Sequence, residues 1–238
     1  MVRRTKEEAL ETRNLLLDVA ERVFNEKGVS RTSLADIAEA AGLTRGAIYW
    51  HFKNKSDLFD AMMERVTLPL EQLVERSADP QLEDPLFFIK ACAVNVLQRT
   101  ATDDQMRRVF DIVCHKCEYV DDMAPLKERH LESRSACLAQ VEEGIRNAIN
   151  KGALPAGVDA RRAAIGMHAL IDGLIANWLL DTAYFDLWHE GERIIDTYLD
   201  GLKRAADEPA VGKAPKKAGK ESAKGATSPA GRSAGRLQ

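Results

Sequence analysis

Cysteine is scarce in this 238-residue chain, and neither sign of charge dominates it. Four cysteines are too few for a disulfide scaffold at this length, which excludes a small disulfide-stapled secreted domain. The 34 basic and 37 acidic residues give a formal charge of −3, which excludes a polyelectrolyte, and 30% charged residues exclude a membrane protein. The first residues contain no apolar run of the secretory type. We therefore expect a soluble cytoplasmic protein.

The near-zero total charge hides a basic C-terminal segment. Residues 209–238 contain seven basic residues and one acidic residue, so they carry +6 and the remainder carries −9. This segment consists mainly of Ala, Gly, Pro, Ser and Lys, which cannot bury enough apolar surface to offset the entropy of ordering. We expect a disordered basic tail over 208–238. It either attracts polyanions without sequence preference or serves only as a solubilising extension.

The rest of the chain has the apolar periodicity of helices, with repeats at three and four residues and no sustained alternation. The predicted fold class is all-α, with a three-helix N-terminal domain over 1–55 and a helical bundle over 56–207. The predicted helices span about 7–27, 33–41, 45–52, 54 or 56 to 78, 84–100, 104–118, 125–151, 159–181 and 187–206.

Two short helices joined by a glycine turn give the strongest signal. Ala38, Gly42 and Ile48 have the spacing of a helix-turn-helix, in which a small residue allows a close crossing and Gly42 adopts the left-handed turn conformation. Ser33 and Asp36 form a predicted capping box at the start of the first helix. Thr44 caps the second helix, whose buried residues are expected to be Ile48 and Phe52.

The exposed face of the second short helix carries groups that suit DNA. Arg45 can reach a guanine edge, Ala47 a thymine methyl group, and other side chains can reach phosphates. The alternative is that any helix pair with a glycine turn has this pattern and that Tyr49 and Trp50 belong to the core. The DNA-binding candidates are Arg3, Arg4, Thr32, Ser33, Thr44, Arg45, Gly46, Ala47, Tyr49, Trp50, His51 and Lys55.

The run from Thr32 to Phe59 resembles the DNA-binding signature of the TetR family of transcriptional repressors. Residues 1–9, His115–Glu118, Asp121–Met123 and Asp172–Ile175 are similar to the branch that controls multidrug efflux pumps, the AcrR and TtgR type. The resemblance covers roughly residues 1–205. It implies a bacterial, nucleoid-associated homodimer that binds palindromic double-stranded operator DNA, with a ligand cavity in the C-terminal bundle of each subunit.

The helix predicted over 159–181 is apolar nearly all round, but His168, Asp172 and Asn177 argue against a membrane span. A soluble helix of this kind must be covered on both sides. We expect it to pair with the last helix in a homodimer interface of four helices. Gly166 and Gly173 would allow a close helix approach on one stripe.

The resemblance and the helix phase together suggest walls for a drug-sized cavity, mostly apolar with a few polar groups. Asp172 needs a partner because an unpaired buried carboxylate is costly, and a ligand, a structural hydrogen bond or a dimer contact would each serve. Phe110 and Cys114 depart from the polar residues of the family, which implies a more apolar cavity. The candidates are Val66, Cys92, Val96, Phe110, Val113, Cys114, His115, Cys137, Val141, His168, Ile171, Asp172 and Ile175.

Cys114-His115-Lys116-Cys117 allows two other interpretations. As metal ligands on one helix these side chains do not converge well, and a disulfide between cysteines one turn apart would constrain little. We predict neither an enzyme nor a bound cofactor or metal. The expected function is a ligand-responsive repressor of an efflux operon, released from DNA by a lipophilic antibiotic or phenolic compound. Alternatives are a thiol- or metal-sensing repressor and a weakly specific architectural DNA-binding protein that uses the tail.

Overall fold

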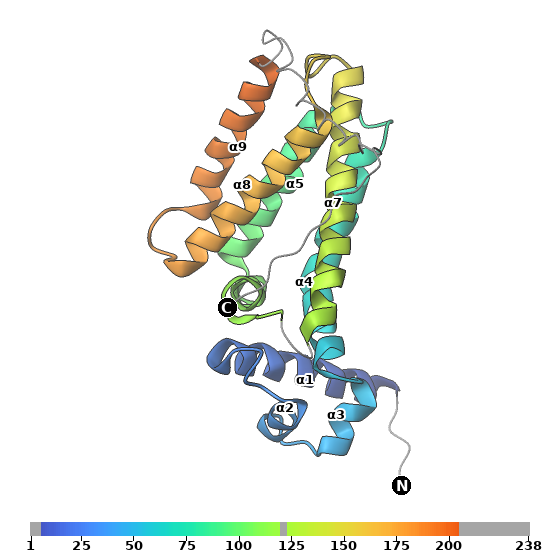
Figure 1. The fold of residues 1–238 in the computed structure, drawn as a ribbon, viewed down its shortest axis with the longest axis vertical. Helices are drawn as coiled ribbons and strands as arrows, with labels where there is room; N and C mark the ends of the chain where they lie inside the picture. Colours follow the sequence, from blue (N-terminus) through green and yellow to red (C-terminus); the bar gives the residue numbers. More distant parts are fainter. Residues whose placement is uncertain (1–5, 120–122, 205–238) are drawn as a thin grey trace, which may run out of the picture. The chain divides into compact units, whose positions relative to one another are not determined.

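Helices make up every regular element in residues 6–119 and 123–204, the part of the chain that the computed structural model describes (Figure 1). The all-α prediction is confirmed for these residues. Arg3, Arg4 and the 208–238 tail lie outside them. The elements are α1 (Lys6–Lys27), α2 (Leu34–Ala40), α3 (Arg45–His51), α4 (Lys55–Glu75), the 3-10 turn η1 (Arg76–Ala78), α5 (Pro85–Thr102), α6 (Asp104–Asp111), the π-helical turn η2 (Ile112–Lys116), α7 (Ala124–Asn150), α8 (Ala160–Leu180) and α9 (Leu187–Arg204).

Most helix boundaries fall within three residues of the prediction, and the clearest difference is the segment predicted as one helix over 104–118. It consists of α6 followed by η2, whose backbone takes the wider π form and ends at Cys117. The apolar pattern does not distinguish the two forms, because a π turn inserts only one residue into the helical period. The helix α4 continues through Pro69 without a break.

Hydrogen bonds from capping residues fix where the short N-terminal helices begin. The Ser33 hydroxyl accepts from the Asp36 N–H at 3.2 Å, and the Ser33 N–H donates to the Asp36 carboxylate at 2.8 Å, which completes the predicted capping box. The hydroxyl and the N–H of Ser33 both donate to the Asp36 carboxylate, and these two bonds lower the pKa of Asp36. Gly42 has φ of 67°, the left-handed value expected for the turn. The Thr44 hydroxyl accepts from the Ala47 N–H and so caps α3.

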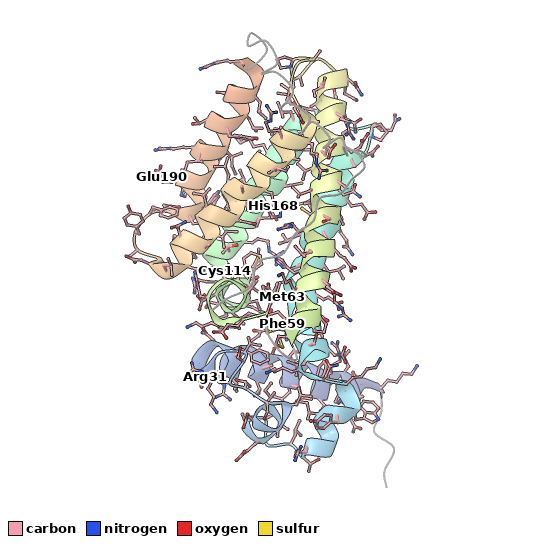
Figure 2. All side chains as sticks on the ribbon, viewed as in Figure 1. Arg31, Phe59, Met63, Cys114, His168 and Glu190 are labelled. Atoms are coloured by element: carbon pink, nitrogen blue, oxygen red, sulfur yellow. The ribbon has the colours of Figure 1, made fainter. Side chains whose placement is uncertain are left out.

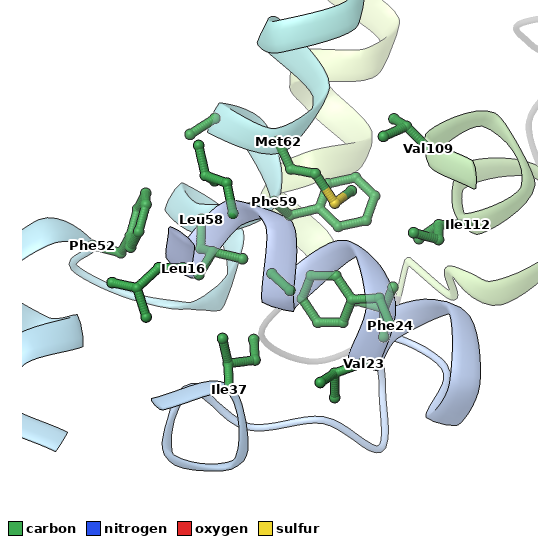
Figure 3. Packing of buried hydrophobic residues seen from close by; sticks show 14 of the residues in the cluster. Leu16, Val23, Phe24, Ile37, Phe52, Leu58, Phe59, Met62, Val109 and Ile112 are labelled. Carbon is green, nitrogen blue, oxygen red and sulfur yellow. The ribbon is translucent and has the colours of Figure 1, made fainter. Parts of the chain in front are cut away.

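One hydrophobic cluster joins the first three helices to the helices that follow (Figure 3). Leu16 and Phe24 of α1 are fully buried with Ile37, Ile48 and Phe52 from the helix-turn-helix. The ring centroids of Phe24 and Phe59 lie 6.0 Å apart, so α4, which contains Phe59, packs against α1 in this cluster. Val109 of α6 and Ile112 of η2 belong to the same cluster. This core therefore extends across the domain boundary predicted between residues 55 and 56, and that boundary stays a prediction.

A second cluster fills the bundle formed by α5, α7, α8 and α9, and small residues set its closest helix contacts. A Cβ at Gly191 would lie 2.4 Å from Leu97, and a Cβ at Gly166 would lie 2.2 Å from the Tyr198 hydroxyl. Gly166 therefore allows α9 of the same chain to approach, rather than a helix of a second copy. A Cβ added at Gly173 would meet no atom of the described residues within 4 Å, outside the backbone of α8 itself, so this position stays available for an outside contact.

The helix α8 is long and apolar enough to cross a membrane by length and composition alone. Only 28% of its most apolar stretch is buried in the single chain. Ile165 and Leu180 of this helix are exposed, as is Ile194 of α9. Within the described residues, nothing covers these apolar side chains.

The turn at Gly42 gives a test of the local architecture. We expect Gly42→Ala to lower the free energy of unfolding by about 1–2 kcal/mol, because a Cβ disfavours the left-handed backbone. No atom lies within 4 Å to add a clash. Gly201→Ala in α9 is the matched control and should raise stability by up to about 1 kcal/mol. Chemical denaturation measures both, and shifts of the same sign would contradict the argument.

Candidate DNA interface and effector cavity

The outer surface of α3 carries the side chains predicted to contact DNA. Thr44, Arg45 and Gly46 are exposed, while Ala47 and His51 are half-buried. Tyr49 is 50% exposed and Trp50 is 72% exposed, so the alternative that they are core residues is wrong. The Trp50 and His51 rings meet edge to face at 4.6 Å, which fixes the two side chains relative to each other.

The two candidates at the start of α2 have structural partners. Thr32 is 2% exposed and its hydroxyl donates to the Gly28 carbonyl at 2.8 Å, so it completes the end of α1. This burial takes Thr32 out of the predicted DNA surface. Ser33 is exposed, but its hydroxyl donates to Asp36 at 2.7 Å as part of the capping box.

Lys55 differs most from its expected place. Its side chain is buried, and its ammonium group donates to the Val29 carbonyl at 3.0 Å and to the Ser30 carbonyl at 3.5 Å. The first turn of α4 is thereby tied to the loop between α1 and α2, and the expected phosphate contact from Lys55 does not fit this geometry. Lys53, two residues earlier, is exposed.

Val29 also connects this loop to η2. The Val29 N–H donates to the Lys116 carbonyl at 3.0 Å, while the Val29 carbonyl accepts from Lys55. Nearby, Glu21 of α1 is 2% exposed and lies 3.5 Å from Arg65 of α4 and 3.8 Å from Arg108 of α6. Polar contacts therefore join α1 to both α4 and the α6–η2 segment.

A cavity of about 630 Å³ lies between α4 and α7 and also reaches η2. Phe59 and Met63 line it from α4 (Figure 2), and Val113 of η2 completes one wall. The volume suits a drug-sized molecule. The lining residues are Phe59, Asp60, Met63, Glu64, Thr67, Leu68, Glu71, Gln72, Val74, Glu75, Val113, Tyr119, Leu126, Arg129, His130, Glu132, Ser133, Ala136, Cys137 and Gln140.

Acidic groups outnumber basic ones along this cavity. Among the described residues, five carboxylates line it, against the single guanidinium of Arg129, which pairs with Asp60. Glu71 accepts a hydrogen bond from the Ser133 hydroxyl at 3.1 Å across the cavity. The His130 ring lies 6.1 Å from the Tyr119 ring, and burial lowers the pKa of His130. The cavity combines apolar walls with a negative charge.

Val113 and Cys137 are the expected wall residues that line this cavity. The other candidates are not among the residues that line this cavity, and their contact with an effector stays a prediction. Three of them are buried: Val66, Cys92 and Ile175. Four pack against the two hydrophobic clusters: Val96, Phe110, Val141 and Ile171. The Nδ1 atom of His115 lies 2.8 Å from the Asp111 carboxylate, with which it pairs. The polar stripe of α7 that includes Arg129, His130, Ser133 and Gln140 was missed, although its three- and four-residue spacing marks one helix face.

Asp172 finds its partner within α8. Its carboxylate lies 2.9 Å from His168 Nδ1, one turn earlier, and the Asp172 side chain is 65% exposed. Cys114 is partly open to solvent, yet the surrounding protein atoms, and then Asp172 and Asp111, raise its pKa to about 11. Within the described ranges 6–119 and 123–204, no three His, Cys, Asp or Glu side chains are arranged to hold a metal ion.

Comparison with known proteins gives matches along most of the chain. Residues 16–62 match the family described as bacterial regulatory proteins of the tetR family, and residues 84–204 match the MAATS-type transcriptional repressor C-terminal region. The regulator TtgR of Pseudomonas putida is 42% identical over 203 residues, which cover 85% of this chain and 97% of TtgR.

Solved structures agree with this assignment. NalD, the secondary repressor of the MexAB-OprM multidrug efflux pump in Pseudomonas aeruginosa, is 37% identical with a TM-score of 0.76, over 84% of this chain and all of NalD. The complex of SmeT, from Stenotrophomonas maltophilia, with triclosan is 32% identical with a TM-score of 0.75, over 87% and 99% of the two chains. These relatives are transcriptional regulators and not enzymes. The chain belongs to the TetR family of bacterial transcriptional regulators.

Proposed function

We propose that this chain is a ligand-responsive repressor of a multidrug efflux operon, bound to a palindromic operator in the bacterial cytoplasm and released by a lipophilic compound. The observation that carries the proposal is that α4 serves both sites. Its first turn holds the loop that precedes the helix-turn-helix, and its middle lines the α4–α7 cavity. A molecule in that cavity therefore acts on the same helix that supports the DNA-reading helices.

Two copies of the chain would read the two halves of the operator. A homodimer through α8 and α9 would cover the exposed apolar face of Ile165, Leu180 and Ile194. Twofold symmetry would place two α3 helices in successive major grooves, roughly 34–36 Å apart. The uncovered apolar face supports this pairing because isolated soluble helices do not keep such surfaces in water.

The proposed DNA contacts fall into two groups: contacts to base edges, which read the sequence, and contacts to the sugar-phosphate backbone, which position the protein. Arg45 reads a guanine edge, and Ala47 touches a thymine methyl group. Tyr49, Trp50 and His51 flank these residues and contact the backbone, as does the exposed Lys53. Thr44, Gly46 and Ser33 border the same surface, and Arg3 and Arg4 remain proposed contacts of the N-terminal arm.

The chemistry of the cavity favours one effector class. Its apolar walls accept lipophilic rings, and its five carboxylates stabilise a positive charge on the ligand. SmeT is described in complex with triclosan, a compound without such a charge. We therefore propose that lipophilic cations act on this chain in addition to neutral phenolic compounds, with Glu71 as a counter-charge beside Val113 and Cys137.

The proposed release mechanism uses the contacts around Val29. A ligand against Met63 and Val113 displaces α4 relative to η2, and this movement strains the bonds from Val29 to Lys55 and Lys116. The separation of the two α3 helices then no longer matches the operator. A ligand shifts this equilibrium only if it binds the DNA-incompetent state more tightly.

The experiment that tests this function is a titration of the protein on its own upstream DNA with excess competitor DNA, with and without lipophilic cations and phenolics. Operator-specific binding that a compound of either class releases is the expected result. Glu71→Gln should weaken release by cations about tenfold and leave release by neutral phenolics unchanged. Binding that competitor DNA abolishes would contradict the repressor function and favour an architectural role through the tail.

Arg45 gives a test of sequence reading. Arg45→Ala should weaken operator binding by about 1–3 kcal/mol per half-site and relax the preference at one base pair of each half-site, because a bidentate guanine contact is lost there. Lys53→Ala is the control, and it should weaken binding evenly across sequences and reduce the salt dependence. Binding to a set of single-base operator variants measures both. Equal loss on every sequence for Arg45→Ala would contradict its reading role.

The thiols give a test of the sensing alternative. The pKa of Cys92, Cys114 and Cys117 is raised to about 11, mainly by burial. At pH 8 only about one such thiol in a thousand is ionised, against about a quarter at the ordinary pKa. Alkylation of Cys92, Cys114 and Cys117 in the native protein at pH 8, followed by mass spectrometry, should therefore be at least about a hundredfold slower than in urea and should speed up towards pH 11. Fast alkylation together with loss of DNA binding would favour a thiol sensor.

A further inference from the structure

Arg13 of α1 is a cation whose partner is an aromatic ring. Its guanidinium carbon lies 5.2 Å from the centroid of the Phe52 ring, within cation–π range. Among residues 6–119 and 123–204, no carboxylate lies within 4 Å of it to form an ion pair. The side chain is half-buried, so one face of the guanidinium is covered while its charge is not neutralised.

Phe52 fixes this cation relative to the recognition helix. Phe52 directly follows α3, its N–H donates to the Ile48 carbonyl at 2.9 Å, and the residue is 1% exposed. Leu16, one turn after Arg13 on α1, is fully buried and packs in the same cluster as Ile37 and Phe52 (Figure 3), and Leu17 is also fully buried. Arg13 therefore lies at the margin of that core, where the buried stripe of α1 ends.

Of the residues that follow Phe52, Lys53 adds an exposed cation, while the Lys53 N–H and the Asn54 side-chain oxygen are already paired with Asp57. Lys53 follows Phe52 and is exposed, and its N–H donates to Asp57 at 2.9 Å. Asn54 caps α4 by accepting from the Asp57 N–H at 2.8 Å. The ammonium group of Lys55 is turned inwards to Val29, so it does not contribute its charge to this surface.

We propose that Arg13 is a DNA-backbone contact residue, held over the Phe52 ring so that its N–H donors meet a phosphate beside the half-site read by α3. A guanidinium stacked on a ring keeps its in-plane donors available, and these match two phosphate oxygens. Because Phe52 is attached to α3, the contact sets the register of the recognition helix on the duplex. This inference rests on the proposed operator binding.

The test is operator affinity as a function of salt for full-length variants. Arg13→Gln should lower affinity about threefold to tenfold at moderate salt, on operator and non-specific DNA alike, and reduce the slope of log K against log salt by about 1.8 for the bound dimer, about 0.9 for each subunit. Arg13→Lys keeps the charge but not the planar stack, so it should retain the slope and bind more weakly than wild type. Arg22→Gln is the matched control, since Arg22 is exposed on the opposite face of α1 and should leave the slope unchanged.

A role confined to covering Phe52 would give a different result. Arg13→Gln would then lower the Tm but keep the wild-type slope, and this outcome would overturn the proposal. A slope reduced equally by Arg22→Gln would overturn it as well, because the effect would then be one of net charge. Failure of the wild-type protein to bind its operator would instead remove the proposed function, which the wild-type titration determines first.

Discussion

The backbone of Val29 holds the DNA-reading helices against the rest of the protein through both of its polar groups. Its N–H reaches the Lys116 carbonyl of η2, and its carbonyl accepts from the buried ammonium of Lys55. Burying an ammonium group is costly unless its donors are satisfied, so Lys55 is held firmly to this loop. The positions of α2 and α3 relative to the bundle depend on this pair of contacts.

Glu21 supports the same junction from the neighbouring turn of α1. Burial raises the pKa of its carboxyl group, while a hydrogen bond from Gln105 and the charges of Arg65 and Arg108 act in the opposite direction. A buried carboxylate of this kind stabilises only the arrangement in which its donors are in place. α1, α4 and α6 therefore have one favourable relative position, and displacement of any one of them loses several bonds together.

Local signals in the sequence were sufficient for the helices and for the turn of the DNA-reading domain. Ser33, Gly42 and Thr44 act through bonds or dihedral angles within a few residues, and these depend little on the remaining fold. The direction of Lys55 and the lining of the cavity depend on how distant helices rotate against each other. No pattern within α4 shows that Met63 faces the cavity and Val66 the core. The tail and the arm residues lie outside the described residues, so those expectations stay predictions.

The uncovered apolar face of α8 has a consequence for the abundance of the protein. Where a second copy covers Ile165 and Leu180, folding and association become one equilibrium, and the stability of each chain increases with its concentration. Newly made chains at low concentration would be the most easily unfolded and degraded. In a growing cell that dilutes this protein, its concentration would therefore fall faster than dilution alone predicts. The protein would accumulate only when its synthesis keeps its concentration high enough for two copies to pair.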